Sequence, residues 1–276
     1  MTKPKEVRPA LPSQIRGLCG KSAIVTGSTG GIGLAIARAL ALAGANVMLN
    51  GLGDAVQIKH VRESLADEAG VAVEFDDSDL SVPDLVIRLA AHAKQSFGRV
   101  DILVNNASIQ HVSPIEEFRE DKWNAILALN LSAVFHATKA VFGDMKARRF
   151  GRIVNISSAH GLVASPFKAA YVAAKHGVVG LTKVTALEGA EFGVTANAIC
   201  PGYVWTPLVE KQIEDQASAR RISREQVVRD VLLAQQVNKR FVTADEIAAL
   251  AVFLASDAAS SITGAALPVD GGWTAH

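Results

Sequence analysis

Short apolar runs recur along this chain of 276 residues, and each is followed by a longer segment with helical periodicity. Runs that are almost continuously apolar are typical of strands covered by helices on both faces. Regular alternation of strand and helix predicts right-handed crossovers and therefore a parallel sheet. The predicted strands are Ala23–Thr26, Ala45–Asn50, Val71–Phe75, Ile102–Asn105, Ile153–Ser157, Thr195–Cys200 and Ala266–Val269. The predicted helices are Ile32–Ala43, Ala55–Ala69, Pro83–Phe97, Asp121–Arg148, Tyr171–Glu191 and Ala244–Ala255, the last capped by Thr243 and Glu246.

This alternation predicts a single α/β domain over residues 17–276, a doubly wound Rossmann-type fold with a central parallel sheet. Residues 1–16 contain three prolines and four basic side chains but no apolar core. We therefore expect a flexible N-terminal tail there rather than a secretory signal. The polar segment 207–240 follows the sixth strand and is either a mobile helical lid or an ordinary pair of surface helices.

The composition narrows the possible classes of function. Hydrophobic residues make up 49% of the chain and aromatic residues only 5%, so the apolar excess is aliphatic, as in helices packed on a buried sheet. With a net charge of +1 and scattered Lys and Arg, neither nucleic acid nor an anionic membrane is an expected partner. No apolar stretch approaches the roughly 20 residues of a membrane-spanning helix. Cys19 and Cys200 lack the spacing of a metal or redox site, so we expect reduced thiols, no bound metal and a cytoplasmic location.

A glycine cluster lies between the first predicted strand and the first predicted helix. It reads Thr26-Gly27-Ser28-Thr29-Gly30-Gly31-Ile32-Gly33. Glycine lets the backbone turn sharply and approach a pyrophosphate, whose charge the N-terminus of the helix stabilises. The spacing Gly-x3-Gly-x-Gly differs from the commoner Gly-x-Gly-x-x-Gly fingerprint. Bare turns also use glycine, but this position at the first strand–helix junction favours a dinucleotide cofactor.

The stretch after the second predicted strand bears on which dinucleotide is bound. It reads Asn50-Gly51-Leu52-Gly53-Asp54. A 2′-phosphate on the ribose would need a cation here, and neither this stretch nor the glycine cluster contains Lys or Arg. NAD is therefore favoured over NADP, although Asn50 stands where an acid commonly binds the ribose. Asp79 and Leu80, after the third strand, are candidates for the adenine edge, and Asp79 is also compatible with a solvated loop.

A serine, a tyrosine and a lysine are spaced in a way that suits hydride-transfer chemistry. Ser158 follows the fifth predicted strand, and Tyr171 and Lys175 lie four residues apart on the next helix, so they share one face. A free tyrosine has a pKa near 10, and a neighbouring ammonium favours its phenolate. Ser158 would then hold the substrate oxygen, and Asn130 is a candidate anchor for a water that connects Lys175 to solvent.

These motifs resemble the short-chain dehydrogenase/reductase family from about Gly17 to the end of the chain. Further matching motifs are Asn105-Asn106-Ala107, Pro201-Gly202 and Val269-Asp270-Gly271-Gly272. The resemblance implies a catalytic tetrad of Asn130, Ser158, Tyr171 and Lys175. With the glycine cluster and the strand ends, the implied cofactor contacts are Gly27, Thr29, Gly31, Ile32, Gly33, Leu52, Asp79, Leu80, Asn106, Tyr171, Lys175, Pro201, Thr206 and Leu208. Ser108 departs from the pattern, because the family has glycine at this position.

Longer blocks resemble the bacterial 3-hydroxybutyrate dehydrogenase branch of this family. They are Asn50–Asp54, Ile109–His111, Ile126–Ser132, His160–Ser165, Val172–Val179, Pro207–Gln212 and Gly272–Thr274. The resemblance implies the substrate pair 3-hydroxybutyrate and acetoacetate, with Ser158 and Tyr171 at the reacting oxygen. It also implies a carboxylate cradle of Gln110, His160, Lys168 and Gln212, all hydrogen-bond donors, with Trp273 as a wall of the pocket. Tyr203 and Trp205 depart from this branch, which has Trp and a different residue there.

Two other functions fit parts of the sequence. A reductase of another small 3-oxo acid, or an NADPH-dependent reductase of 3-oxoacyl thioesters, would share the tetrad, but a thioester reductase would want a cation near Asn50 and a more open pocket. A cofactor-binding protein without turnover would have lost Tyr171 or Lys175, and both are present. The family resemblance also implies a homotetramer formed through the helices Asp121–Arg148 and Tyr171–Glu191, with the last strand making a second contact.

Overall fold

A seven-stranded, fully parallel sheet forms the centre of the molecule, in the order β3-β2-β1-β4-β5-β6-β7. The structure is a computed structural model that describes residues 17–205, 209–210, 213–214, 217 and 221–275. The strands are β1 Ser22–Val25, β2 Asn46–Asn50, β3 Val73–Asp76, β4 Ile102–Asn105, β5 Gly151–Ile156, β6 Val194–Pro201 and β7 Ala266–Val269. The predicted parallel, doubly wound α/β fold is confirmed, and every predicted strand is present within two residues at each end.

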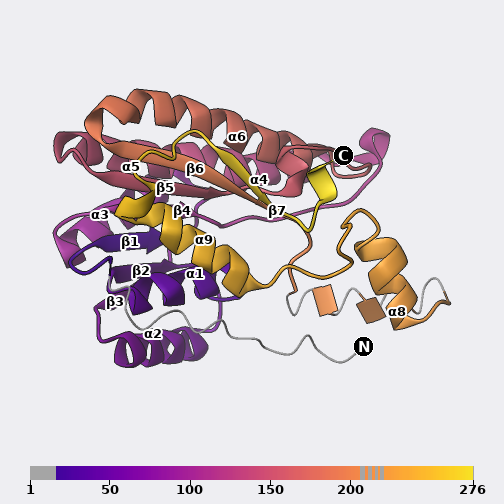
Figure 1. The fold of residues 1–276 in the computed structure, drawn as a ribbon, viewed down its shortest axis with the longest axis horizontal. Helices are drawn as coiled ribbons and strands as arrows, with labels where there is room; N and C mark the ends of the chain where they lie inside the picture. Colours follow the sequence, from indigo (N-terminus) through magenta and orange to yellow (C-terminus); the bar gives the residue numbers. More distant parts are fainter. Residues whose placement is uncertain (1–16, 206–208, 211–212, 215–216, 218–220, 276) are drawn as a thin grey trace.

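Helices cover both faces of this sheet (Figure 1). They are α1 Gly31–Leu42, α2 Ala55–Ala69, α3 Pro83–Phe97, α4 Glu120–Leu127, α5 Ala133–Ala147, α6 Ala169–Gly189, α8 Arg224–Gln226 and α9 Ala244–Ala255. Helices α1 and α9 pack against each other on one face, and α3, α5 and α6 lie on the other. The cap predicted for the last long helix is confirmed, because the Thr243 hydroxyl accepts from the amide of Glu246 and the Glu246 carboxylate accepts from the amide of Thr243.

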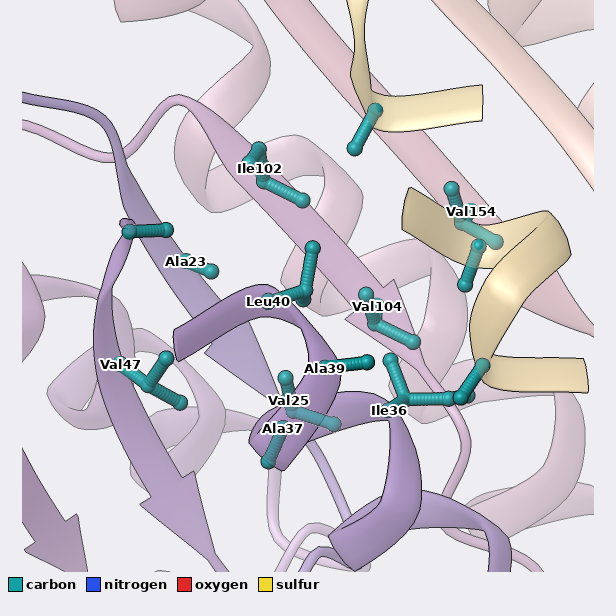
Figure 2. Packing of buried hydrophobic residues seen from close by; sticks show 14 of the residues in the cluster. Ala23, Val25, Ile36, Ala37, Ala39, Leu40, Val47, Ile102, Val104 and Val154 are labelled. Atoms are coloured by element: carbon teal, nitrogen blue, oxygen red, sulfur yellow. The ribbon is translucent and has the colours of Figure 1, made fainter. Parts of the chain in front are cut away.

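Each strand divides its side chains between two hydrophobic cores, since successive residues of a strand point to opposite faces. In β1, Ala23 and Val25 join the core beneath α1 and α9, whereas Ile24 joins the core beneath α3 and α5. Figure 2 shows the first of these cores, where Ile36 and Leu40 of α1 lie among the side chains of the central strands. Complete burial of such aliphatic side chains stabilises the fold by roughly 1.5–3 kcal/mol each.

The long helix predicted over residues 121–148 is two helices joined by a π-helical turn. α4 ends at Leu127, the wider turn spans Ala128–Ser132, and α5 begins at Ala133. Asn130 lies inside the turn, where its side chain bonds a neighbouring loop instead of facing solvent. The predicted helix is thus present as one helical run from Glu120 to Ala147, and the sequence did not indicate the π-helical turn inside it.

The same helical run, Glu120–Ala147, is long and apolar enough to span a membrane by length and composition, contrary to the sequence-based expectation. Its apolar side chains have a different partner in this fold. Ala133, Ala137, Val141 and Met145 of α5 are buried in the core beneath α3 and α5. One face of the run is therefore packed against the core of the sheet.

The segment between β6 and α9 has its own small hydrophobic cluster. Ile213, Val227, Leu232, Leu233 and Phe241 are buried together, separately from the two main cores. Its described helical elements are α8 and a π-helical turn over Val227–Leu232. Figure 1 places this segment beside the sheet, apart from the helices that cover the two faces. The prediction of a helical segment after the sixth strand agrees with the part of this region that the structure describes.

Candidate active site

A cavity of about 590 Å³ opens where the carboxyl ends of β4, β5 and β6 meet. Its walls come from the residues directly after these strands, namely Asn106, Ser157, Ser158 and the stretch from Gly202 to Val204. The order of the strands reverses next to this cavity, since β1 pairs with β2 on one side and with β4 on the other. Ligands of open α/β sheets bind at such a switch point.

The glycine cluster forms a tight turn at the edge of this cavity. Gly27 and Gly31 have φ angles of +62° and +55°, in the left-handed region that favours glycine. A Cβ on Gly33 would lie 2.2 Å from the carbonyl oxygen of Gly27, so the two backbones could not approach. The Asn106 amide donates to the carbonyls of Thr26 and Gly27, at 3.0 Å each, and fixes the turn from the neighbouring strand.

The first turn of α1 completes a cradle that fits a pyrophosphate. It contains no acidic residue and its N-cap, Gly30, makes no side-chain hydrogen bond, so the first backbone N–H groups remain available to an anion. Closely approaching backbone, positive φ angles and a bare helix N-terminus together match a dinucleotide. Gly27, Thr29, Gly31, Ile32 and Gly33 are the residues that would hold it.

The predicted adenosine end is built mainly from backbone. Asn50 is 1% exposed, and its amide donates to the carbonyls of Asp76 and Ser78, so it ties β2 to the loop after β3. The Asp79 carboxylate accepts from the amide and hydroxyl of Ser81, which lowers its pKa. Leu80 is buried in the core beneath α3, so an adenine contact there would fall to its backbone.

Leu52 and Thr29 lie together at the same end. The Thr29 hydroxyl donates to the carbonyl of Leu52 at 3.4 Å, and the Leu52 side chain is 68% exposed. Among the described residues, neither the glycine turn nor the loop after β2 presents a cation, in keeping with their sequences. The ribose end of the cradle therefore offers no positive charge to a ligand.

Ser158, Tyr171 and Lys175 line one wall of the cavity. Ser158 follows β5, and Tyr171 and Lys175 lie one turn apart on α6, as their spacing predicted. The Ser158 hydroxyl lies close enough to the Tyr171 phenol to lower its pKa. The Lys175 ammonium donates to the carbonyl of Ile156 at 2.8 Å and lies 5.6 Å from the centre of the Tyr171 ring.

Burial controls the protonation of this group. It raises the pKa of Tyr171, against a smaller lowering by the Ser158 hydrogen bond, and it lowers the pKa of Lys175 to about 8. In the chain without a bound nicotinamide ring, burial therefore outweighs the influences that favour the Tyr171 phenolate. Desolvation disfavours both charged forms, and the ammonium is held by a neutral carbonyl.

Asn130 fixes the loop between β4 and α4. Its side-chain amide donates to the carbonyl of Ile109 at 2.8 Å and accepts from the amide of the same residue at 2.9 Å. Gln110, the next residue, lines the cavity from this loop. The π-helical turn thus places the buried side chain of Asn130, which is 1% exposed, where it holds the loop that carries Gln110. Its predicted role with a water beside Lys175 stays a prediction.

Two of the residues predicted to hold a carboxylate lie in the same cavity. Lys168 and His160 line the cavity, and burial lowers the pKa of both, that of His160 to about 4. The ring nitrogens of His160 face two hydroxyls, Ser165 at 2.9 Å from Nε2 and Ser158 at 3.5 Å from Nδ1. His160 is therefore a neutral imidazole that contacts Ser158, which the sequence did not indicate.

Ten of the predicted site residues line this cavity. Those that line it are Ile32, Asn106, Gln110, Ser158, His160, Lys168, Tyr171, Lys175, Pro201 and Trp273. Gly27, Thr29, Gly31, Gly33, Leu52, Asp79 and Leu80 belong to the turn and the adenosine end, outside the cavity wall, and Asn130 lies behind it. Thr206, Leu208 and Gln212 lie outside the described residues, as does the tail 1–16. Tyr203, which the sequence analysis noted only as a departure from the related branch, also lines the cavity and is one of two tyrosines in the chain.

The sequence of this chain matches known proteins along most of its length. Residues 21–217 match the family model described as short chain dehydrogenase. The chain belongs to this family. A D-beta-hydroxybutyrate dehydrogenase of Rhizobium meliloti is 53% identical over 256 residues, which cover 93% of this chain and 99% of that protein. One of Cupriavidus necator is 53% identical over 259 residues, which cover 94% of this chain and 100% of that protein.

A solved structure shares the fold and holds a cofactor. It is a protein of Agrobacterium tumefaciens assigned as a 2-deoxy-D-gluconate 3-dehydrogenase, with bound NADP. It is 34% identical, with a TM-score of 0.81, and the match covers 95% of this chain and all of that one. Short-chain dehydrogenases use nicotinamide cofactors, and the cradle described above fits one.

Proposed function

We propose that this chain is an NAD-dependent dehydrogenase that oxidises (R)-3-hydroxybutyrate to acetoacetate and catalyses the reverse reduction. One observation carries this proposal: the cavity that holds Ser158, Tyr171 and Lys175 also holds Lys168, a partly buried ammonium with no carboxylate partner among the described residues. A small 3-oxo acid has a ketone for the first group and a carboxylate for the second. The names of the two full-length relatives support the same substrate.

The residues divide the reaction between them. In reduction the Tyr171 phenol gives its proton to the ketone oxygen, and in oxidation the phenolate takes that proton back. The Ser158 hydroxyl holds the same oxygen, and Lys175 favours the phenolate by its charge. A bound nicotinamide ring supplies or accepts the hydride at the carbon that carries this oxygen. Lys168 holds the carboxylate, helped by Gln110 and, by sequence, Gln212, while Trp273 walls the pocket.

The proposal of NAD rather than NADP rests on charge. A 2′-phosphate on the ribose carries negative charge that a cation would have to match. The turn Thr26–Gly33 and the stretch Asn50–Asp54 contain no Lys or Arg. The side-chain amide of Asn50 already donates hydrogen bonds to two backbone carbonyls. Because a solved relative holds NADP, the two cofactors are compared directly in the experiment below.

We also propose that the protein is a cytoplasmic homotetramer built on α4, α5 and α6. These helices expose large apolar side chains, among them Trp123, Phe135, Val184 and Leu187, the last 80% exposed in the single chain. Such side chains are covered when helices of two copies pack together. Light scattering should give four times the chain mass of 29.0 kDa, and a monomer would contradict this assembly.

The segment 207–240 is proposed to act as a lid over the cavity. Val209 and Leu232 of this segment line the cavity, so its movement would open or close the site. Closure would bring in Gln212 and exclude water. The hydrophobic cluster of this region is separate from the two main cores.

The test is the initial rate of NADH oxidation with acetoacetate, measured beside NADPH and beside acetoacetyl-CoA. The proposed function predicts fast turnover with NADH and the free acid. Activity only with NADPH and the thioester would contradict the carboxylate cradle and the cofactor choice together, while leaving Ser158, Tyr171 and Lys175 in their roles. Activity on another small 3-oxo acid in place of acetoacetate would keep the cradle and change the substrate.

A further inference from the structure

Both tyrosines of this chain line the same cavity, and only Tyr171 has a role in the chemistry. Tyr203 enters the cavity from the residues after β6. Its ring stacks on that of Trp273, with centres 5.7 Å apart and planes 5° from parallel. The two phenols lie close enough that the charge on one influences the pKa of the other. Tyr203 is therefore a second phenol within reach of a molecule bound in this cavity.

The position of Tyr203 is fixed by its backbone. Its amide donates to the side-chain carbonyl of Gln236, which is fully buried, and its carbonyl accepts from the amide of Val242 at 2.9 Å. The Gln236 amide in turn donates to the carbonyl of Arg240. Because the main chain is held at both groups and the ring is held by Trp273, the phenol oxygen is pre-organised and not a mobile surface group.

The Lys168 ammonium lies over the Tyr203 ring, 5.7 Å from its centre. Neither the phenol oxygen of Tyr203 nor this ammonium makes a hydrogen bond or ion pair with any side chain or backbone group in the part of the chain that the structure describes. Neither atom is one of the buried unpartnered polar atoms of the described residues, so both remain open to a molecule that enters the cavity. An oxygen anion of a bound molecule is the acceptor that suits both.

The contacts along the wall also fix which part of a substrate reaches Tyr203. Tyr171 is followed by His160, whose ring lies 6.1 Å away, and His160 is followed by Trp273 at 4.9 Å and then by Tyr203. The reacting oxygen binds at the Tyr171 end of this row. A group at the Tyr203 end is therefore the far end of the substrate, where a 3-oxo acid has its carboxylate.

We propose that the Tyr203 hydroxyl and the Lys168 ammonium together hold the substrate carboxylate, so that Tyr203 sets the preference for free acids over their esters and thioesters. This inference rests on the proposed function, which supplies the 3-oxo acid. Burial raises the pKa of Tyr203, so the phenol keeps its proton and donates at neutral pH. A charged acceptor roughly doubles the strength of such a hydrogen bond.

The first experiment compares Tyr203→Phe with the wild type on acetoacetate and on its neutral methyl ester, both with NADH. Phenylalanine keeps the ring on Trp273 and removes only the hydroxyl. We expect KM for acetoacetate to rise roughly 10- to 100-fold, with kcat and NADH affinity within about twofold of wild type and the ester unaffected. An equal loss on both substrates, or no loss on either, overturns the proposal.

Trp205→Phe is the matched control. It changes an aromatic side chain two residues away that packs edge-on against Phe241, with ring centres 5.1 Å apart, and does not line the cavity. Acetoacetate kinetics of this variant should stay near wild type. If it raised KM as much as Tyr203→Phe does, the effect would belong to the packing of the segment and not to the hydroxyl.

Acetate binding to the enzyme–NADH complex, followed by tryptophan fluorescence, tests the anion site without turnover. Wild type should bind acetate about tenfold or more tightly than Tyr203→Phe, and the effects of Tyr203→Phe and Lys168→Met should be non-additive in a double-mutant cycle. Equal acetate binding by wild type and Tyr203→Phe, or additive effects, refutes the shared site. Failure of wild type to reduce acetoacetate would refute the proposed function alone, because the acetate titration still decides the role of Tyr203.

Discussion

The glycine turn and the aromatic wall of the cavity differ in what they offer to the cofactor and the substrate of the proposed reaction. The turn, Thr26–Gly33, offers backbone N–H groups and contains no titratable side chain. The wall offers side chains, with Lys168 and Tyr203 as donors beside Trp273. The turn is eight consecutive residues, whereas the wall is gathered from positions about 100 residues apart in the sequence.

This difference separates what can vary in the two regions. In the turn, the proposed binding of the cofactor depends on glycine, because a Cβ on Gly33 would overlap the Gly27 carbonyl. In the wall, recognition depends on which side chain is present, so one substitution changes the ligand without changing the fold. Cofactor binding is thus tied to backbone geometry, and substrate choice to the chemistry of a few side chains.

The largest effect should come from Tyr171→Phe, which removes the chemistry and leaves both binding regions intact. We expect kcat to fall on the order of 10³-fold or more, because the proton on the reacting oxygen loses its donor and acceptor. NADH affinity, measured by fluorescence titration, should stay within about twofold. Substantial remaining turnover would assign the general acid to another group.

Gly33→Ala should weaken cofactor binding at the glycine turn. The new Cβ would lie 2.2 Å from the Gly27 carbonyl oxygen and 2.5 Å from the Asn106 amide nitrogen, and such overpacking costs roughly 1–3 kcal/mol. NADH binding should weaken about 10- to 100-fold by titration. Gly30→Ala is the control, because its φ of −172° is ordinary extended backbone and a Cβ there meets nothing within 4 Å. Equal losses in the two variants would contradict the steric explanation.

Lys168→Met should weaken substrate binding at the aromatic wall of the cavity. It keeps the length and apolar stem of the lysine and removes the charge, so KM for acetoacetate should rise about tenfold or more. NADH affinity should not change, since Lys168 lies on the wall and not at the glycine turn. A matching loss of NADH affinity would show that the two regions are coupled.

The last prediction concerns stability instead of activity, and it follows from the burial of His160. The pKa of His160 is lowered to about 4 by burial, while the unfolded chain has an ordinary value near 6.5. As the pH falls from about 6.5 to 4, the unfolded state takes up a proton that the folded state does not. His160 should therefore cost on the order of 2–3 kcal/mol of unfolding free energy at the acid end.

His160→Gln removes this titration and checks its sign. Urea unfolding at pH 7 and pH 4.5 should show a smaller loss of stability on acidification for the variant than for wild type. NADH affinity of the wild type should vary little over the upper part of this range, because no titratable side chain lies in the glycine turn. The same acid sensitivity in the variant would assign it to other groups.

The sequence by itself determined the sheet, the glycine turn and the pairing of Tyr171 with Lys175. Each of these depends on local spacing: apolar runs mark buried strands, the positive φ angles at Gly27 and Gly31 suit only glycine well, and an interval of four residues places two side chains on one helix face. Patterns of this kind extend over only a few residues. They were sufficient to predict the fold and the placement of Tyr171 and Lys175 on one helix face.

Only the tertiary structure decided the π-helical turn at Asn130, the two hydroxyls facing His160, and the stack of Tyr203 on Trp273. The tertiary structure also decided the direction in which the pKa of Tyr171 moves, because burial raises it. Asn130 meets a loop some 20 residues earlier, and Tyr203 and Trp273 are 70 residues apart. Contacts of this kind depend on how the layers pack, and burial depends on the whole fold, so neither has a local signature in the sequence.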